Sequence, residues 1–275
     1  MRTIKTALVT GASSGIGKSI AAQLLHEGYQ VFVAARRIEQ MQDLVELGAT
    51  AIKMDITSES DIKAAMEQIK TSAEGVDILI NNAGYAIYGA VEDTSIEDAR
   101  RQFEVNIFGL AGLTQQVLPY MRSQKAGTII NISSVGGKIY TPLGAWYHAT
   151  KHALEGWSDC LRLELQPFGI DVIIIEPGGI LTEFAEVLSD PMMERSGKSA
   201  YSNMAKSVSK STERMYSKES KISKPQVIAD VVSKALRASK PKTRYAAGFM
   251  AKPILFFRWM LSDRMFDALI RSQIK

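Results

Sequence analysis

The chain has 275 residues, of which 46% are hydrophobic and 23% charged, so it is long enough for one sizeable domain and is not a disordered or fibrous protein. A single cysteine excludes an internal disulfide framework and a cysteine-based zinc site. The net charge of +4 is uneven, because residues 1–188 sum to −7 (15 Lys and Arg against 22 Asp and Glu) and residues 189–275 to +11 (18 against 7).

Short apolar runs alternate with longer amphipathic stretches along most of the chain. We predict strands over 6–9, 31–34, 51–53, 76–80, 127–132, 171–175 and 242–246, and helices over 15–28, 37–48, 58–73, 96–124, 145–168 and 227–239. Because the strands are rich in Val and Ile, this alternation predicts an α/β fold with a doubly wound parallel sheet covered on both faces. The N-terminus, with Arg2 and Lys5, leads straight into the first strand, so we expect no signal peptide. No apolar run reaches the roughly 20 residues that span a bilayer.

A glycine-rich turn, Gly11-Ala12-Ser13-Ser14-Gly15-Ile16-Gly17, joins the first predicted strand to the first helix. Glycines permit a tight turn in which backbone N–H groups approach a pyrophosphate, and the helix N-terminus adds positive partial charge. The spacing differs from G-x-G-x-x-G, but the position between strand and helix favours a dinucleotide-binding turn over an ordinary one.

The second strand is followed by Arg36 and Arg37 rather than by an acidic residue. A carboxylate at this point suits the ribose 2′-hydroxyl of NADH, whereas a guanidinium suits the 2′-phosphate of NADPH. We therefore predict a preference for NADP(H), with NAD(H) as the weaker alternative. The other interpretation is that the two arginines only begin an exposed helix. Asp55, after the third strand, either meets the adenine amino group or caps the next helix.

Tyr147 and Lys151 lie four residues apart on a predicted helix and therefore project from one face. A phenol with a pKa of ~10 is a poor acid–base group at neutral pH. A neighbouring ammonium favours the phenolate and lowers that pKa, so the phenol can exchange a proton with an alkoxide. When this spacing occurs without other motifs, the alternative interpretation is that the two residues are an exposed pair on the helix surface.

The pair does not stand alone. Asn81-Asn82-Ala83-Gly84 follows the fourth strand, Asn106 lies in the next helix, and Ser134 precedes Tyr147 by thirteen residues. With these motifs the chain resembles the short-chain dehydrogenase/reductase family, over about residues 3–182 by motif and to about 246 by order of elements. The stretch from Ser134 to Tyr147, with residues 153–156, is most similar to the branch of 17β-hydroxysteroid dehydrogenases and retinol-type reductases.

The resemblance implies the catalytic roles. Tyr147 would be the general acid in carbonyl reduction, and Lys151 would bind the nicotinamide ribose and depress the pKa of Tyr147. Ser134 would orient the substrate carbonyl, and Asn106 would hold a water that links Lys151 to solvent. The implied reaction is hydride transfer between NADP(H) and a lipophilic ketone or aldehyde of steroid, retinoid or long-chain type. The alternatives are a 3-oxoacyl-thioester reductase and a cofactor-binding regulator without turnover.

The resemblance also implies the cofactor contacts. They would come from the glycine turn, the ends of the next strands, the catalytic helix and the segment Pro177–Thr182, namely Gly11, Ser13, Ser14, Gly15, Ile16, Gly17, Arg36, Asp55, Ile56, Asn82, Ala83, Gly84, Tyr147, Lys151, Pro177, Gly178, Ile180 and Thr182. Family members that prefer NADPH often carry Lys or Arg just before the second glycine. This chain has Ser14 there, so Arg36 would carry most of the discrimination.

The predicted organisation is one Rossmann-like, NADP(H)-binding domain over residues 1–250, with an amphipathic C-terminal extension over 251–275. Residues 183–224 are predicted to be a mobile, partly helical lid, because Ser189–Lys224 contains 10 Ser and 8 Lys or Arg. Its larger apolar residues would close over a substrate, namely Phe184, Val187, Leu188, Met192, Met193, Tyr201 and Met204.

Residues 252–275 mix aromatic and basic residues and allow three interpretations. They make weak contact with an anionic membrane surface, they pack on the body, or they pack on another subunit. We expect a homodimer or homotetramer at a cytoplasmic or membrane-peripheral location. We expect no nucleic-acid partner, because the body is acidic and has no recognition motif. We also expect no metal, so His148 and His152 would be structural, and Cys160 would be a small buried side chain.

Overall fold

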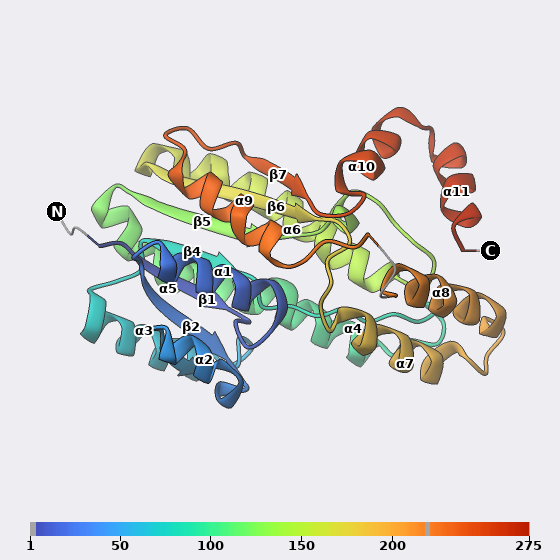
Figure 1. The fold of residues 1–275 in the computed structure, drawn as a ribbon, viewed down its shortest axis with the longest axis horizontal. Coiled ribbons are helices and arrows are strands. Elements are labelled where there is room, and N and C mark those ends of the chain that lie inside the picture. Colours follow the sequence, from blue (N-terminus) through green and yellow to red (C-terminus); the bar gives the residue numbers. More distant parts are fainter. Residues whose placement is uncertain (1–3, 218–220, 275) are drawn as a thin grey trace.

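The structure is a computed structural model that describes residues 4–217 and 221–274, the side chains of residues 184–187 excepted. Seven strands form one sheet in the order β3-β2-β1-β4-β5-β6-β7, and every pair of neighbours is parallel (Figure 1). The strands are β1 (Thr6–Thr10), β2 (Gln30–Ala35), β3 (Thr50–Lys53), β4 (Ile78–Asn81), β5 (Gly127–Ile132), β6 (Ile170–Pro177) and β7 (Arg244–Ala247). The predicted doubly wound α/β fold is therefore confirmed. The strand order reverses between β1 and β4, where such sheets bind ligands.

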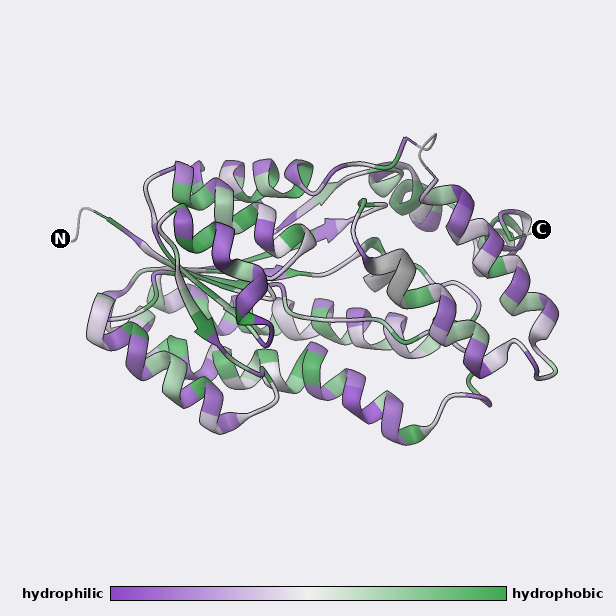
Figure 2. Cartoon of the chain, turned by 60° about the horizontal axis from the view of Figure 1, so that its bottom comes forward, coloured by the Kyte–Doolittle hydropathy of each residue, from purple (hydrophilic) through white to green (hydrophobic). Residues whose placement is uncertain are grey.

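Helices cover both faces of the sheet. They are α1 (Gly15–His26), α2 (Gln42–Glu46), α3 (Glu59–Ala73), α4 (Ile96–Phe103), α5 (Leu110–Gln124), α6 (Ala145–Leu165) and α9 (Gln226–Arg237). One core cluster joins α1, α2 and α9 to the sheet, and a second joins α3, α5 and α6 to the opposite face. The helices carry hydrophobic and hydrophilic residues in alternation (Figure 2), which is typical of amphipathic helices packed on a sheet.

The helix predicted over 96–124 is not continuous. A π-helical turn over Glu104–Gly109 separates α4 from α5. Position 109 has room only for glycine, because a Cβ there would collide with the carbonyl of Ile56. The π turn therefore sits where α5 approaches the loop after β3, and it carries Asn106.

The helices of the lid segment and of the C-terminal segment lie beyond the carboxyl edge of the sheet (Figure 1). The lid segment contains α7 (Phe184–Ser196) and α8 (Ser202–Met215), so its described part is mostly helical. The amphipathic segment at the C-terminus is two helices, α10 (Ala251–Met260) and α11 (Asp263–Ser272). In the described part of the chain, no helix has both the length and the apolar character that crossing a membrane requires.

Candidate active site

The glycine turn lies at the carboxyl end of β1. Gly11 and Gly15 have φ angles of +64° and +57°, a region that side chains rarely adopt. A Cβ on Gly11 would lie 2.9 Å from the Cα of Ala83, and one on Gly17 would collide with Asn82. Ser14 is the N-cap residue of α1 and makes no side-chain capping hydrogen bond. The turn thus offers a tight curve and a helix N-terminus, which together favour an anion.

Asn82 holds the glycine turn in place through hydrogen bonds. Its side-chain nitrogen donates hydrogen bonds to the carbonyls of Thr10 (3.0 Å) and Gly11 (3.1 Å). The backbone N–H groups of Asn82 and Ala83 both donate to the Thr10 hydroxyl oxygen at 3.0 Å. Asn82, predicted as a cofactor contact, therefore ties β4 to β1 and fixes the shape of the turn.

A cavity of about 430 Å³ opens beside the turn. Eight of the predicted cofactor contacts line it, namely Gly11, Ser13, Ser14, Arg36, Asp55, Ile56, Ala83 and Gly84. Arg37, which follows Arg36 after β2, lines it too, and sequence reasoning missed other lining residues, namely Tyr85, Asp98, Arg101 and Arg195, which come from the loop after β4, α4 and α7. The cavity has space for a mononucleotide-sized part of a cofactor, which lies within the usual range of ligand pockets.

The two arginines after β2 differ in their contacts. Arg37 donates to the Ser13 hydroxyl at 3.5 Å and lies 3.9 Å from Glu183. Arg36 lines the cavity and, among the described residues, has no hydrogen bond or ion pair. Its guanidinium is therefore available to an anionic group in the cavity.

Asp55 is not a helix cap. The N-cap of α3 is Ser58, whose hydroxyl accepts from the Asp61 backbone N–H at 3.2 Å. One carboxylate oxygen of Asp55 accepts hydrogen bonds from the backbone N–H (3.0 Å) and the hydroxyl (2.8 Å) of Thr57. Asp55 thus forms a local turn at the cavity wall.

Ser134 and Tyr147 meet at the start of α6. The Ser134 hydroxyl accepts from the Gly136 backbone N–H at 3.0 Å. A Cβ on Gly136 would lie 3.2 Å from both this hydroxyl and a ring carbon of Tyr147, so the two side chains lie close together. Burial raises the pKa of the Tyr147 phenol above its ordinary value, and the Ser134 contact opposes this in part. The direction is opposite to the predicted depression by Lys151, because burial outweighs every favourable contact.

Lys151 lies one helical turn after Tyr147. Its Nζ donates to the Ile132 carbonyl oxygen of β5 at 2.9 Å. Burial lowers the pKa of Lys151 to about 8, while the Glu155 carboxylate acts in the opposite direction. The lysine therefore changes charge close to physiological pH.

Both ends of the Asn106 side chain are hydrogen-bonded. Its Oδ1 accepts from the Tyr85 backbone N–H at 3.1 Å, and its Nδ2 donates to the Tyr85 carbonyl (2.9 Å) and the Thr150 hydroxyl (3.1 Å). The Thr150 hydroxyl in turn donates to the Tyr147 carbonyl at 2.8 Å. Asn106 thus holds the loop after β4 against the helix that carries Tyr147.

The segment Pro177–Thr182 begins at the last residue of β6. Gly178 donates its N–H to Ala247 (2.8 Å), and Gly179 pairs with Phe249, while Ile180 is buried in the core. Thr182 lies over the glycine turn, because a Cβ on Gly15 would be 3.1 Å from its Cγ2. The structure therefore brings this segment to the glycine turn, as predicted, although the side chain of Ile180 points into the core.

The lid is anchored at its tip. Ser196 accepts from the Ala90 N–H at 2.9 Å, Ser199 donates to Asp93 at 2.6 Å, and Tyr201 donates to Glu92 at 2.9 Å. Arg195 lies 3.6 Å from Asp98. The prediction of a mobile lid missed this docking, because the contacts join residues about a hundred positions apart.

Apolar lid residues have different environments. Leu188 and Met192 are buried, Met193 and Tyr201 pack against a small cluster around Leu143, and Met204 is 42% exposed. The predicted contacts of the Phe184 and Val187 side chains fall outside the described residues. Tyr88 lies with its ring centroid 6.0 Å from that of Tyr147, and Tyr216, at the end of α8, interacts electrostatically with both. No local sequence pattern indicates these two tyrosines.

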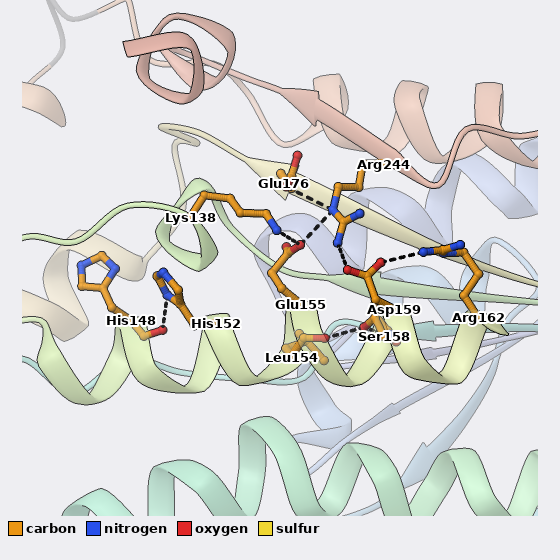
Figure 3. Close-up of polar contacts among 11 residues, drawn as sticks. Lys138, His148, His152, Leu154, Glu155, Ser158, Asp159, Arg162, Glu176 and Arg244 are labelled. Atoms are coloured by element: carbon orange, nitrogen blue, oxygen red, sulfur yellow. Dashed lines mark hydrogen bonds and ion pairs between the residues drawn. The ribbon is translucent and has the colours of Figure 1, made fainter. Parts of the chain in front are cut away.

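An ion-pair cluster around the buried Glu155 carboxylate lies farther along α6 (Figure 3). One oxygen of Glu155 is 3.0 Å from both Lys138 Nζ and Arg244 Nε, while Arg244 also contacts Asp159 (2.6 Å) and Glu176 (3.7 Å). The other oxygen of Glu155 is buried without a hydrogen-bond partner among the described residues. The cluster joins α6, β6 and β7 and includes the acidic residue that faces Lys151.

Both histidines of α6 make backbone contacts. His148 Nε2 accepts from the Thr141 N–H at 3.1 Å, so its Nδ1 carries the proton donated to the Gly136 carbonyl at 2.9 Å. His152 Nδ1 lies 2.8 Å from the His148 carbonyl oxygen (Figure 3). Cys160 is exposed, so the prediction of a buried cysteine is wrong.

The chain has clear relatives among known proteins. The family model described as short chain dehydrogenase matches residues 5–192. The NADPH-dependent 3-dehydrocapnine reductase of Ornithobacterium rhinotracheale is 33% identical over 99% of this chain and 98% of its own. The 3-ketodihydrosphingosine reductase of Bacteroides thetaiotaomicron is 40% identical over 65% of each chain. The crystal structure of a short-chain dehydrogenase from Streptomyces avermitilis superposes with a TM-score of 0.80 at 33% identity, covering 98% of this chain and 96% of that one.

Proposed function

Because the chain belongs to the short-chain dehydrogenase/reductase family, we propose that it transfers hydride from NADPH to a lipophilic ketone or aldehyde, with Tyr147 as the proton donor. The family itself makes the chain an NAD(P)-dependent dehydrogenase/reductase that acts on CH–OH or carbonyl groups, with a nicotinamide cofactor and a small-molecule substrate. The preference for NADPH, the substrate class and the role of each residue are our proposal.

The close placement of the Ser134 and Tyr147 side chains beside Gly136 is the observation that carries the proposed chemistry. A carbonyl oxygen placed against both hydroxyls would accept two hydrogen bonds, which strengthen as negative charge develops on it. Burial keeps the phenol protonated at neutral pH, which is the form that reduction needs. A bound nicotinamide supplies the hydride.

Lys151 acts after the proton has left Tyr147. Its ammonium, held by the Ile132 carbonyl, favours the phenolate and supports reprotonation. Lys151 would also bind the nicotinamide ribose. The role proposed for Asn106, a water link from Lys151 to solvent, rests on the family resemblance and on its place in the π turn.

The glycine turn, the free guanidinium of Arg36 and the adjacent cavity support NADPH as the cofactor. The diphosphate would lie against Gly11–Gly17 at the N-terminus of α1, and the 2′-phosphate would meet Arg36 with Ser14. Asp55 and Ile56 would flank the adenine. Asn82, Ala83 and Gly84 would face the ribose region, and Pro177, Gly178, Ile180 and Thr182 the nicotinamide.

The apolar lid residues support a lipophilic substrate, since Met192 belongs to a buried cluster against which Tyr88, the ring neighbour of Tyr147, packs. The 3-ketodihydrosphingosine reductase and the 3-dehydrocapnine reductase, by their names, reduce oxidised substrates whose carbonyl is at position 3. The residues around Ser134 and Tyr147 support placement near the 17β-hydroxysteroid dehydrogenase and retinol-type branch. We also propose a homodimer or homotetramer at a cytoplasmic, membrane-peripheral location.

Steady-state oxidation of NADPH, followed at its absorbance band with a panel of carbonyls, tests the proposal. The panel contains a water-soluble ketone, a steroid ketone, retinal, a long-chain aldehyde and a 3-oxoacyl thioester. We expect turnover with the lipophilic carbonyls and a kcat/KM for NADPH at least about tenfold above that for NADH. The thioester as the best substrate would favour the thioester reductase, and NADPH binding without turnover on any carbonyl would favour a regulator.

A further inference from the structure

We propose that the outward face of α10 docks on an anionic lipid bilayer, with the cationic stripe of α8 beside it. The stripe is defined by Lys206, Lys210 and Arg214. The purpose of docking, which is the uptake of a lipophilic substrate, rests on the proposed function. The evidence for docking itself is independent of that function.

The outward face of α10 is apolar and unpartnered among the described residues. Phe256, Trp259 and Met260 are 53%, 81% and 51% exposed and, at spacings of three and four, share one side of the helix. The rings of Phe256 and Trp259 lie 6.1 Å apart, so the patch is contiguous. Contiguous exposed apolar surface of this kind marks an interaction site.

The inward face of α10 is occupied. Ile254 and Phe257 pack in a cluster with Phe266 of α11 and Ile139. Arg258 lies over the rings of Tyr140 and Phe266, at 5.6 and 5.5 Å from their centroids. The helix is therefore held in place by one side, and its orientation does not depend on the partner that covers the other.

The charges of the terminal helices leave cations free. Asp263 pairs with Arg258 at 3.0 Å and Asp267 with Arg271 at 3.8 Å, which uses both acids of these helices. Lys252, one turn before Phe256 on the same face, and Arg264 have no ion pair within residues 4–217 and 221–274. Aromatic and cationic side chains together suit the headgroup boundary of an anionic bilayer.

The α8 stripe adds to this charge. Lys206, Lys210 and Arg214 recur every four residues, are exposed, and have no ion pair in the described ranges. Ser211 of α8 donates to the Gln273 carbonyl at 3.1 Å, which places α8 beside the end of α11 (Figure 1). Each cation near an anionic surface contributes to binding.

A second copy of the chain fits the outward face of α10 less well than an anionic bilayer does. A symmetric contact brings the same patch of two subunits together, so Lys252 would face its own copy. An anionic surface removes that repulsion. The bilayer is therefore the partner whose charge complements the patch.

The position of α10 connects the docking face to the candidate active site. Its first residue, Ala251, packs against Gly178, and its cluster includes Val135, next to Ser134. A bilayer on the outward face would lie close to both segments. A lipophilic substrate could then pass from lipid to the site with little exposure to water.

Co-sedimentation of the full chain with vesicles tests the proposal. We expect binding to vesicles of phosphatidylcholine and phosphatidylglycerol at low salt, weaker binding at high salt, and a blue shift of Trp259 fluorescence. Phe256→Ser with Trp259→Ser should weaken binding at least about tenfold. Lys206→Gln with Lys210→Gln should weaken it about fivefold or more, and only on anionic vesicles. Leu163→Ser, which changes an exposed apolar residue of α6, is the matched control and should bind as the unchanged chain does.

Equal binding by the Phe256/Trp259 variant, or no pelleting with anionic vesicles at low salt, would overturn the proposal. A dimer that this variant turns into a monomer, without vesicle binding, would assign the face to a second copy. NADPH oxidation with a water-soluble ketone, measured without vesicles, should stay within about twofold in all these variants. Failure of docking leaves that activity intact, whereas failure of the proposed function removes it and leaves vesicle binding unchanged.

Discussion

Residues 1–188 carry a charge of −7 and residues 189–275 a charge of +11, and the two regions meet through specific ion pairs. Arg195 meets Asp98, Arg237 meets Glu27, and Arg244 meets Glu155, Asp159 and Glu176. The asymmetry is thus partly the complementarity of two packed regions. Several cations of the basic region have no ion pair in the described ranges, and those on α8, with Lys252 and Arg264, are among them and are exposed.

The two regions also differ in what they bring to the site. The acidic region contributes Ser134, Tyr147 and Lys151, and the basic region contributes the lid and the terminal helices. We therefore expect changes in the acidic region to alter the chemical step, cofactor binding or stability. Changes in the basic region should alter substrate binding and access.

The pH dependence of kcat/KM tests the acidic region through a large expected change in rate. Burial lowers the pKa of Lys151 to about 8. The lysine is charged below that pH and loses its proton above it, so kcat/KM for reduction should fall by about tenfold per pH unit well above pH 8. In the unchanged chain and in a lid variant, kcat/KM should begin to fall at the same pH. A fall that begins at a different pH in the lid variant would contradict the division of roles between the two regions.

Glu155→Gln tests the ion-pair cluster that joins the two regions. It leaves Lys138 without its partner and weakens the pairing of Arg244. Breaking a fully buried pair costs about 3–5 kcal/mol in the free energy of unfolding, and because Lys138 and Arg244 are partly exposed we expect about 1–3 kcal/mol here, to be measured by urea denaturation. Glu164→Gln, at an exposed site on the same helix, should change stability by less than about 0.5 kcal/mol. A loss of less than about 1 kcal/mol for Glu155→Gln would mean that the cluster does not join the regions energetically.

Arg36→Ser tests cofactor choice in the acidic region. Loss of a hydrogen-bonded charge pair with a 2′-phosphate should raise KM for NADPH about tenfold or more and leave that for NADH unchanged. Arg37→Ser is the matched control, because Arg37 is engaged by Ser13 and Glu183. Equal effects of the two substitutions would remove Arg36 from the discrimination.

Asp93→Ala tests the lid and gives the smallest expected effect. It removes the acceptor of the Ser199 hydroxyl, 2.6 Å away, and loosens the tip of the lid. KM for a lipophilic carbonyl should rise about threefold to tenfold while kcat changes little. Glu97→Ala, at an exposed neighbouring position without a lid contact in the described part of the chain, should leave both constants unchanged. A fall in kcat with KM unchanged would contradict the division between chemistry and access.

Local patterns carried the sequence predictions that the structure confirmed. The parallel sheet follows from the alternation of apolar strands and amphipathic helices, and the glycine turn and Asn82 do come together, since their motifs end neighbouring strands. The docking of the lid on Glu92 and Asp93 and the convergence of Tyr88 and Tyr216 on Tyr147 were missed. These contacts join distant parts of the chain through single side chains, which leave no periodic signal.

Two further differences have local causes. The π turn at Asn106 inserts into a sequence whose periodicity is that of an ordinary helix, so the interruption is invisible in the pattern. The pKa of Tyr147 moves up instead of down, because burial is a property of the packed fold and not of the Tyr147–Lys151 spacing.

The central claim is that Tyr147 donates the proton during hydride transfer. The most direct test is single-turnover oxidation of bound NADPH by Tyr147→Phe, together with NADPH affinity measured by fluorescence titration. We predict an affinity within about threefold of the unchanged chain and a turnover rate lower by about 10²–10⁴. A single-turnover rate within a few-fold of the unchanged chain, at equal NADPH affinity, would contradict the claim.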